Sequence, residues 1–314
     1  MAHEVESMFS VKQVPWHGLG KIIENSPTIQ DGIELAGLNW EAELHPLFCS
    51  DGAEVTHRAV RRSTDKSVLG IVGPDYTPLQ NREAFDWFQP FVDANLAKLV
   101  TAGSLRNGQR VWVLAQINQA PSEIVKGDLV EKFILLSNGH DGKLAARVGF
   151  TPIRVVCANT MQMAHASEAS KLIRVRHRSA VKQNIDKLRD IMNLANQEFE
   201  ATAEQYRFLA NSNFKKDDVL KYVKQLLDIK DDEKISTRTL NICKDIFARI
   251  DGGLGQNIQG VSGTWWAVYN GFTEYLSYEN GNNADNRLNS LWFGQNQAWN
   301  KQALDLAIEY ATSA

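Results

Sequence analysis

The chain has 314 residues, of which 43% are hydrophobic and 23% are charged, and its formal net charge is −3. This length accommodates one large domain or two ordinary ones, and this composition excludes a disordered or collagen-like protein. The sequence contains neither an apolar run of 18 residues nor the basic-then-apolar start of a signal peptide. We therefore expect a cytoplasmic protein with no membrane segment. The widely spaced Cys49, Cys157 and Cys243 indicate buried thiols in a reducing compartment rather than disulfides or a zinc site.

The charge is unevenly distributed along the chain. Residues 1–97 contain 7 Lys and Arg against 14 Asp and Glu, and residues 179–314 contain 15 against 18. Residues 98–178, in contrast, contain 12 Lys and Arg against only 5 Asp and Glu. A basic block of this kind is typical of a protein with a polyanionic partner, although a solvated surface that keeps the protein soluble would have the same composition.

The first 117 residues predict strands, a helix and a hairpin. Alternating apolar residues between turn formers predict strands over 40–49, 54–62 and 67–73. The segment 81–100 predicts a helix that Asn81 caps and that Pro90 kinks. Within 99–117, Asn107-Gly108 lies between two strand-like runs and predicts a two-residue type I′ turn, in which both residues need positive φ.

The next segment continues the same sheet. Residues 131–150 predict a second hairpin that turns around residues 139–142. Residues 151–166 then predict a helix, with Thr151 as its cap and Pro152 at its first position. The sequence therefore predicts an α+β fold, with an antiparallel β-sheet and helices in a β-β-β-β-α core, and this core coincides with the basic block.

Helical periodicity dominates the rest of the chain. Between Val181 and Leu209, apolar residues recur at alternating steps of four and three, which predicts a long helix with one apolar seam. Further helices are predicted near 215–229, 237–250, 263–278 and 297–312, with a mobile Asn-rich loop over 279–289. We expect two domains: an α+β nucleic-acid-binding core (1–178) and a helical domain for assembly or partner binding (179–314).

No catalytic signature is present. The sequence contains no phosphate-binding loop of the G-x-x-x-x-G-K-[ST] type and no H-E-x-x-H pair, and Gly252-Gly253 is better explained as a helix stop. Asp75, Asp141 and Lys143 are similar in type to the residues of metal-dependent nucleases, but 66 residues separate the two aspartates. We expect no enzyme, no cofactor and no metal, and a metal-dependent nuclease remains an alternative.

The basic block predicts an interface for phosphates. In residues 169–183, arginines alternate with apolar residues or histidine, which in an extended segment aligns their guanidinium groups about 6.6 Å apart. On the predicted elements, Lys143 and Arg147 share one strand face, Arg154 lies at a helix N-terminus, and Arg106 and Arg110 flank the Asn-Gly turn. The predicted nucleic-acid-binding residues are Arg106, Arg110, Lys143, Arg147, Arg154, Lys171, Arg174, Arg176 and Arg178.

Few aromatic residues accompany these cations. Between Lys143 and Arg178 the sole Phe, Trp or Tyr is Phe150, whereas proteins that stack bases interleave aromatic and basic residues. Trp112, beside Arg110, is a stacking candidate, but the sequence favours a core position for it in the hairpin. The pattern favours binding of a nucleic-acid backbone with the bases left free.

Several segments resemble one protein family over nearly the whole chain. The chain resembles the phage/plasmid-like protein family, long catalogued as a domain of unknown function, in which no catalytic residues are established. This resemblance implies a mobile-element protein in a bacterial cytoplasm. The segments that carry it are "PWHGLG" (15–20), "YTPLQNREAF" (76–85), "AGSLRNGQRVWVLA" (102–115), "LLSNGHDGKLAARVGFTPIRVVCANT" (135–160), "IRVRH" (173–177) and "GTWWAVYNGFTEYL" (263–276).

A weaker likeness concerns architecture alone. Antiparallel strands followed by a helix, with basic residues concentrated there, are similar to the core of single-strand annealing proteins of the RecT/Redβ/Erf kind. That likeness implies a ring or filament of identical subunits that holds single-stranded DNA for pairing. The resulting hypothesis is an oligomeric phage or plasmid protein that binds and anneals single-stranded DNA in homologous recombination, with a phage or host recombination protein as a further partner. The second alternative is a non-catalytic protein that modulates a host factor.

Overall fold

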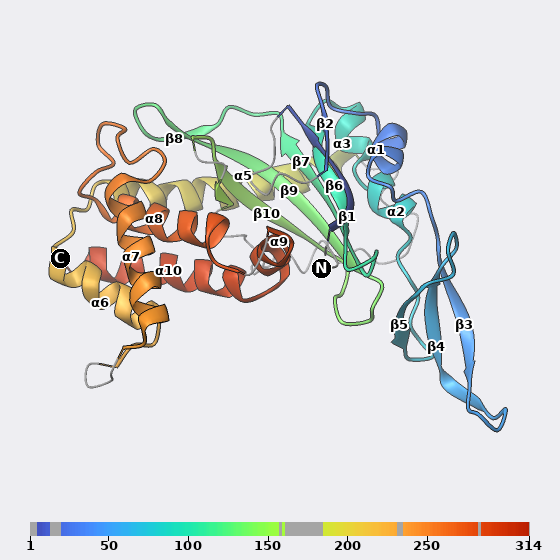
Figure 1. The fold of residues 1–314 in the computed structure, drawn as a ribbon. Helices are drawn as coiled ribbons and strands as arrows, with labels where there is room; N and C mark the ends of the chain where they lie inside the picture. Colours follow the sequence, from blue (N-terminus) through green and yellow to red (C-terminus); the bar gives the residue numbers. More distant parts are fainter. Residues whose placement is uncertain are drawn as a thin grey trace. The chain divides into compact units, whose positions relative to one another are not determined.

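The computed structural model describes residues 5–12, 20–156, 159–160, 185–230, 235–281 and 284–313. These residues form two β-sheets and a helical C-terminal region, so the expected α+β class is confirmed (Figure 1). The chain divides into two compact units whose segments alternate along the sequence. Unit 1 comprises residues 1–119, 133–150 and 165–194, and unit 2 comprises residues 120–132, 151–164 and 195–314. The expected boundary near 178 falls outside the described residues.

The main sheet has the strand order β11-β10-β9-β7-β6-β1-β2, and β8 pairs with β9 beside this path. Its long central strands are buried on both faces and pair antiparallel, as β6 with β7 and β7 with β9. The strands are β1 (Val5–Val11), β2 (Lys21–Ile23), β6 (Ala97–Leu105), β7 (Arg110–Ile117), β8 (Ser122–Val125), β9 (Asp128–Gly139), β10 (Arg147–Arg154) and β11 (Asn159–Thr160).

In unit 1, three short helices pack beside the main sheet and a second sheet extends away from it (Figure 1). The helices are α1 (Ile29–Leu35), α2 (Asn81–Asp86) and α3 (Gln89–Asp93). The second sheet consists of β3 (Ala42–Phe48), β4 (Glu54–Arg62) and β5 (Val68–Val72), in that spatial order and antiparallel. These strands confirm the three that the alternating apolar residues predict.

The Asn-Gly turn between β6 and β7 forms as expected. Asn107 and Gly108 both have positive φ, and the Gln109 N–H donates to the Arg106 carbonyl at 3.2 Å. Arg106 also has a positive φ of 53°, so the paired strands end one residue earlier, at Leu105 and Arg110.

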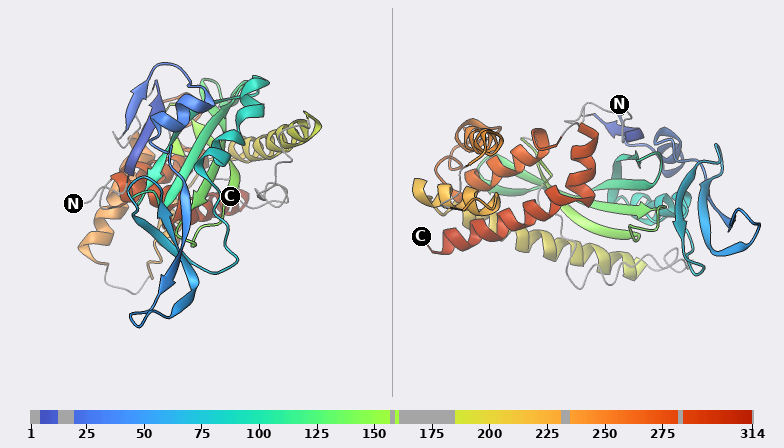
Figure 2. Two further views of the ribbon diagram at one scale, coloured as in Figure 1. Left: turned by 90° about the vertical axis from the view of Figure 1, so that its right-hand side faces the viewer. Right: turned by 60° about the horizontal axis from the view of Figure 1, so that its bottom comes forward.

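The helices of unit 2 surround α8 (Trp265–Tyr278), in which nearly every residue is buried. Helix α10 (Gln295–Thr312) packs against α6 (Lys216–Leu226), α8 and α9 (Ala284–Phe293), and α7 (Thr237–Gly252) packs against α8 (Figure 2). The helix α5 (Ile185–Ala210) confirms the long helix that the sequence predicts from 181, although residues 181–184 lie outside the described residues. Its Tyr206 ring lies 4.8 Å from the Trp266 ring, so the apolar seam packs against helices of the same chain.

Two predicted helices are wrong in part or entirely. The segment 81–100 contains α2 and α3 with a break between them, and its last four residues belong to β6. Asn81 is the first residue of α2, and its buried side chain donates to the Leu38 carbonyl instead of capping the helix. Residues 151–154 continue β10 rather than starting a helix, because the β-branched Thr151 and Ile153 suit a strand that pairs with β11.

Two smaller expectations are also wrong. The Asn-rich stretch contains the helix α9, whose Leu288 and Leu291 are buried. Cys49 is exposed and Cys243 is half-buried, whereas the sequence predicts buried thiols, and Cys157 lies outside the described residues. Gly252 and Gly253 do end α7, as expected.

We predict that Gly108→Ala destabilises the fold more than the same change at Gly127. Both glycines have φ near +85°, which costs an alanine about 1 kcal/mol or more. A Cβ at Gly108 would also collide with the Arg62 guanidinium and lie 3.0 Å from the Trp40 ring, whereas one at Gly127 would meet no atom within 4 Å. Urea denaturation of both variants measures the difference, and equal losses would show that the contact with Arg62 costs nothing.

Candidate functional site

Four of the predicted cations gather at one end of the main sheet in unit 1. We call Arg106, Arg110, Lys143 and Arg147 the basic end. Arg110 pairs with Gly139 across β7 and β9, and the His140 N–H donates to the Gln109 carbonyl at 2.8 Å. These bonds hold the β6–β7 turn, with Arg106 and Arg110, beside the β9–β10 loop that contains Lys143.

Arg147 lies in an environment that is unfavourable for a cation. Its guanidinium is half-buried, and among the described residues its buried Nε has no hydrogen-bond partner. Burial, and then the positive charge of the nearby Arg110, lower the pKa of Arg147 below its usual value. A buried donor beside a like charge is costly unless an anion binds there, so this geometry suits a phosphate.

A network around the buried side chain of Arg62 positions the β6–β7 turn in unit 1. Arg62 on β4 donates from Nη2 to Glu6 Oε2 at 2.7 Å and to the Asn107 carbonyl at 2.6 Å. Its guanidinium lies over the Trp40 ring, 4.8 Å from the centroid. The hydrogen bond with Glu6 raises the pKa of Arg62. Arg62 therefore fixes the turn through its backbone and keeps Arg106 and Arg110 in place.

The β9–β10 loop is anchored by a neutral histidine. His140 is fully buried, and its Nε2 lies 3.0 Å from Asn81 Oδ1. Burial lowers the pKa of His140 to about 4, so the ring stays uncharged at neutral pH. In the same loop, Asp141 Oδ1 accepts from the Lys143 N–H at 2.9 Å. This loop is not the four-residue turn that the sequence predicts, and Lys143 lies in it rather than on the strand that begins at Arg147.

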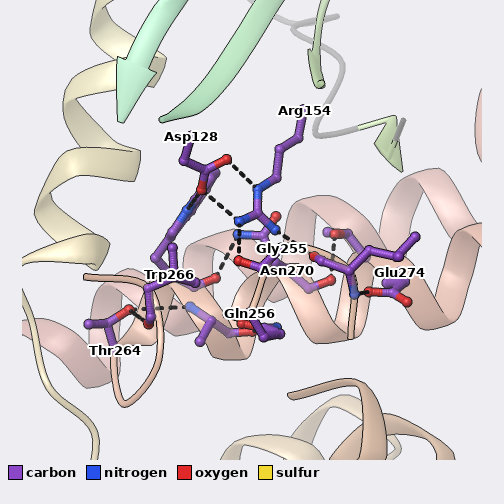
Figure 3. Close-up of polar contacts among 12 residues, drawn as sticks. Asp128, Arg154, Gly255, Gln256, Thr264, Trp266, Asn270 and Glu274 are labelled. Atoms are coloured by element: carbon purple, nitrogen blue, oxygen red, sulfur yellow. Dashed lines mark hydrogen bonds and ion pairs between the residues drawn. The ribbon is translucent and has the colours of Figure 1, made fainter. Parts of the chain in front are cut away.

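Arg154 does not lie at a helix N-terminus, as the sequence predicts, but at the end of β10 in the interior of unit 2 (Figure 3). Its Nε and Nη2 donate to the two carboxylate oxygens of Asp128 at 2.7 and 2.6 Å, and both side chains are 0% exposed. Trp266 Nε1 donates to the same carboxylate at 2.8 Å. Arg154 also donates from Nη1 to the Leu254 carbonyl at 3.2 Å and from Nη2 to the Gly255 carbonyl at 3.1 Å.

This network leaves Arg154 no contact for a phosphate, because four of its five N–H donors are already bonded inside the protein. Its role is to bind the loop after α7 to the strands β9 and β10. The same loop is held from the other side by α8, since Glu274 Oε2 accepts from the Leu254 N–H at 2.9 Å and Gln256 Nε2 donates to the Ala267 carbonyl at 2.9 Å (Figure 3).

The other residues that the sequence predicts for the site are either buried or outside the described residues. Trp112, the stacking candidate, is fully buried in the hairpin core. Lys171, Arg174, Arg176 and Arg178 lie outside the described residues, as does most of "PWHGLG". Within the described residues, no three His, Cys, Asp or Glu side chains come together in an arrangement that could hold a metal ion.

Sequence reasoning missed the partners of the two buried arginines. Glu6 is 56 residues from Arg62 and Asp128 is 26 residues from Arg154. Asp128 follows Gly127 in a turn, so its position alone suggests an exposed residue. The sequence does contain a signal that Arg154 is buried. It follows Val148, Phe150 and Pro152 at steps of two, which places all four residues on one face of a strand.

Comparison with known proteins identifies a family. A model of the family described as a domain of unknown function (DUF932) matches residues 68–297, so the chain belongs to this family. No curated protein and no solved structure matches the chain. None of the helices in the described ranges combines the length and apolar composition that crossing a bilayer requires.

We predict that Arg154→Met lowers the free energy of unfolding by about 3–5 kcal/mol, because the Asp128 carboxylate stays buried without its counter-charge. Adding Asp128→Leu should restore part of this loss. Lys301→Met is the matched control: its ion pair with Asp305 has both side chains 57% exposed, so the loss should be about 0–1 kcal/mol. Chemical denaturation measures all three variants, and equal losses for Arg154→Met and Lys301→Met would contradict the structural role.

We predict that Arg147→Met, unlike Arg154→Met, does not lower the free energy of unfolding. Removing a half-buried cation that repels Arg110 should leave the free energy of unfolding unchanged or raise it, because methionine fills similar space without a charge. The same denaturation experiment without ligand tests this expectation. A loss comparable to that of Arg154→Met would show that Arg147 is a structural residue.

Proposed function

We propose that this protein binds the phosphate backbone of single-stranded DNA at the basic end and promotes annealing of complementary strands. The observation that carries this proposal is the Arg110–Arg147 pair, in which two cations lie close together and the Arg147 Nε has no partner among the described residues. Charge-assisted hydrogen bonds to a phosphate would use this donor and remove the repulsion.

The position of the aromatic residues supports backbone binding. Trp40 and Trp112, which lie in the part of unit 1 that forms the basic end, are buried. Bases would therefore meet no stacking platform from these two residues. A protein that grips phosphates and leaves bases unstacked keeps the strand available for pairing, which is what annealing needs.

The full interface extends beyond the basic end in this proposal. Further phosphate contacts would come from Lys171, Arg174, Arg176 and Arg178. Arg154 would not contribute, because it forms a buried ion pair with Asp128. The protein would act as a homo-oligomeric ring or filament in homologous recombination of a phage or plasmid, in the cytoplasm of its bacterial host. The resemblance to phage/plasmid-like proteins and the weaker likeness to annealing proteins of the RecT/Redβ/Erf kind support this role.

We predict salt-sensitive, sequence-independent binding to single-stranded oligonucleotides. Four phosphate contacts at the basic end should give a slope of log K against log salt near −3, and each further contact should add about −0.7. Arg147→Met should flatten the slope by about 0.7, whereas Lys301→Met should not change it. Fluorescence anisotropy at several salt concentrations measures the slopes, and adding the complementary strand measures annealing. Wild-type binding with a slope near zero, or no binding at low salt, would refute the proposal.

A further inference from the structure

The two faces of the second sheet of unit 1 differ in what covers them. Strand pairing places Val60, Gly70 and Val72 on one face, and Val60 and Val72 are buried. A Cβ on Gly70 would lie 2.6 Å from the Asp141 Cα, so this face packs tightly on the β9–β10 loop. We call the opposite face, with Ile71, Ala59 and His45, the outer face.

The outer face combines exposed apolar residues with paired charges. Cross-strand register aligns Ile71, Ala59 and His45 in one row and Val68, Arg61 and Glu43 in the next. Val68 and Ile71 are 58% and 60% exposed, although β-branched residues on a sheet normally pack against another layer. Two adjacent exposed apolar side chains on one sheet face indicate a contact surface.

The charged residues of the outer face contact one another. Glu43 Oε2 lies 3.1 Å from Lys66 Nζ and 3.1 Å from His45 Nε2, and the Arg61 Nε donates to the Lys66 carbonyl at 2.9 Å. A polyanion would meet the Glu43 carboxylate here, so this surface is a poor fit for nucleic acid. Glu43 and the cations Arg61 and Lys66 lie on the same face as Val68 and Ile71 of the edge strand β5, so two copies of this surface can place opposite charges against each other.

We propose that the outer face binds a second copy of this chain about a twofold axis. In such an isologous contact, Val68 and Ile71 of the two copies meet at the centre, and Glu43 of each copy lies against Arg61 and Lys66 of the other. The two sheets would then form the two layers of a sandwich, about 10 Å apart. This contact does not require DNA and uses no residue of the basic end. It closes at two copies, so the ring or filament of the proposed function would need a second contact between such dimers.

The test is the mass of the protein in solution without DNA. Sedimentation equilibrium should show a wild-type dimer, and Val68→Asp with Ile71→Asp should weaken dimerisation by at least about a hundredfold, because each substitution acts twice across a twofold interface. Phe48→Asp is the matched control: Phe48 is 60% exposed at the end of β3 and pairs with Glu54, so it lies outside both rows. This control should dimerise like the wild type.

Charge exchange tests the self-complementarity. Glu43→Arg and Arg61→Glu should each weaken the dimer, and the two changes in one chain should restore it. A monomeric wild type, or a dimer that Val68→Asp with Ile71→Asp leaves intact, would overturn the inference. Circular dichroism confirms that each variant is folded.

The outcomes for this inference and for the proposed function can be told apart. The double aspartate variant should keep the wild-type slope of oligonucleotide affinity against salt, because its basic end is unchanged. A wild-type dimer that binds no DNA would support the outer-face contact and refute the DNA-binding proposal. A monomer that binds DNA would refute the outer-face contact and support phosphate binding at the basic end.

Discussion

The structure depends on one constraint: a charge in the interior must be paired. The ion pair between Arg154 and Asp128 meets it. Removing such a charge from water costs several kcal/mol, and the bidentate geometry at 2.6 and 2.7 Å offsets this cost. The same rule governs Arg62 with Glu6 and Arg249 with Glu274, whose carboxylate is 1% exposed. In each pair the arginine also joins segments that are distant in the sequence.

Arg147 departs from this rule, and the proposed phosphate contact rests on that departure. Its side chain is half-buried, and the charge that acts on its pKa is that of Arg110, which has the same sign. Such an arrangement lowers the stability of the ligand-free protein and raises the affinity for an anion, since binding removes the repulsion. Arg147 therefore differs from Arg154 and Arg62 in two ways: it is less buried than either, and the charge that acts on it has the same sign.

The sequence predicts those parts of the fold that depend on local chemistry. The Asn107-Gly108 turn, the apolar seam of α5 and the end of α7 at Gly252 all follow from residues within a few positions of each other. Thr151-Pro152 predicts a helix over residues 151–154, because this pair is a good helix start. The observed strand depends instead on pairing with β11 and on burial of Arg154. The candidate site divides in the same way: the sequence identifies its cations, but only the fold shows that Arg154 is structural and that Arg110 and Arg147 are close.

The tryptophans show how the same constraint limits what the surface can recognise. Trp40 lies under Arg62 and Trp266 lies under Arg154, with guanidinium carbons 4.8 and 5.5 Å from the ring centroids. These rings help to accommodate buried cations, because the face of an indole attracts positive charge. Rings used in this way cannot stack on bases. Neither ring is therefore available to bases. A surface that meets its ligand through cations would distinguish a polyanion from other ligands but not one base sequence from another.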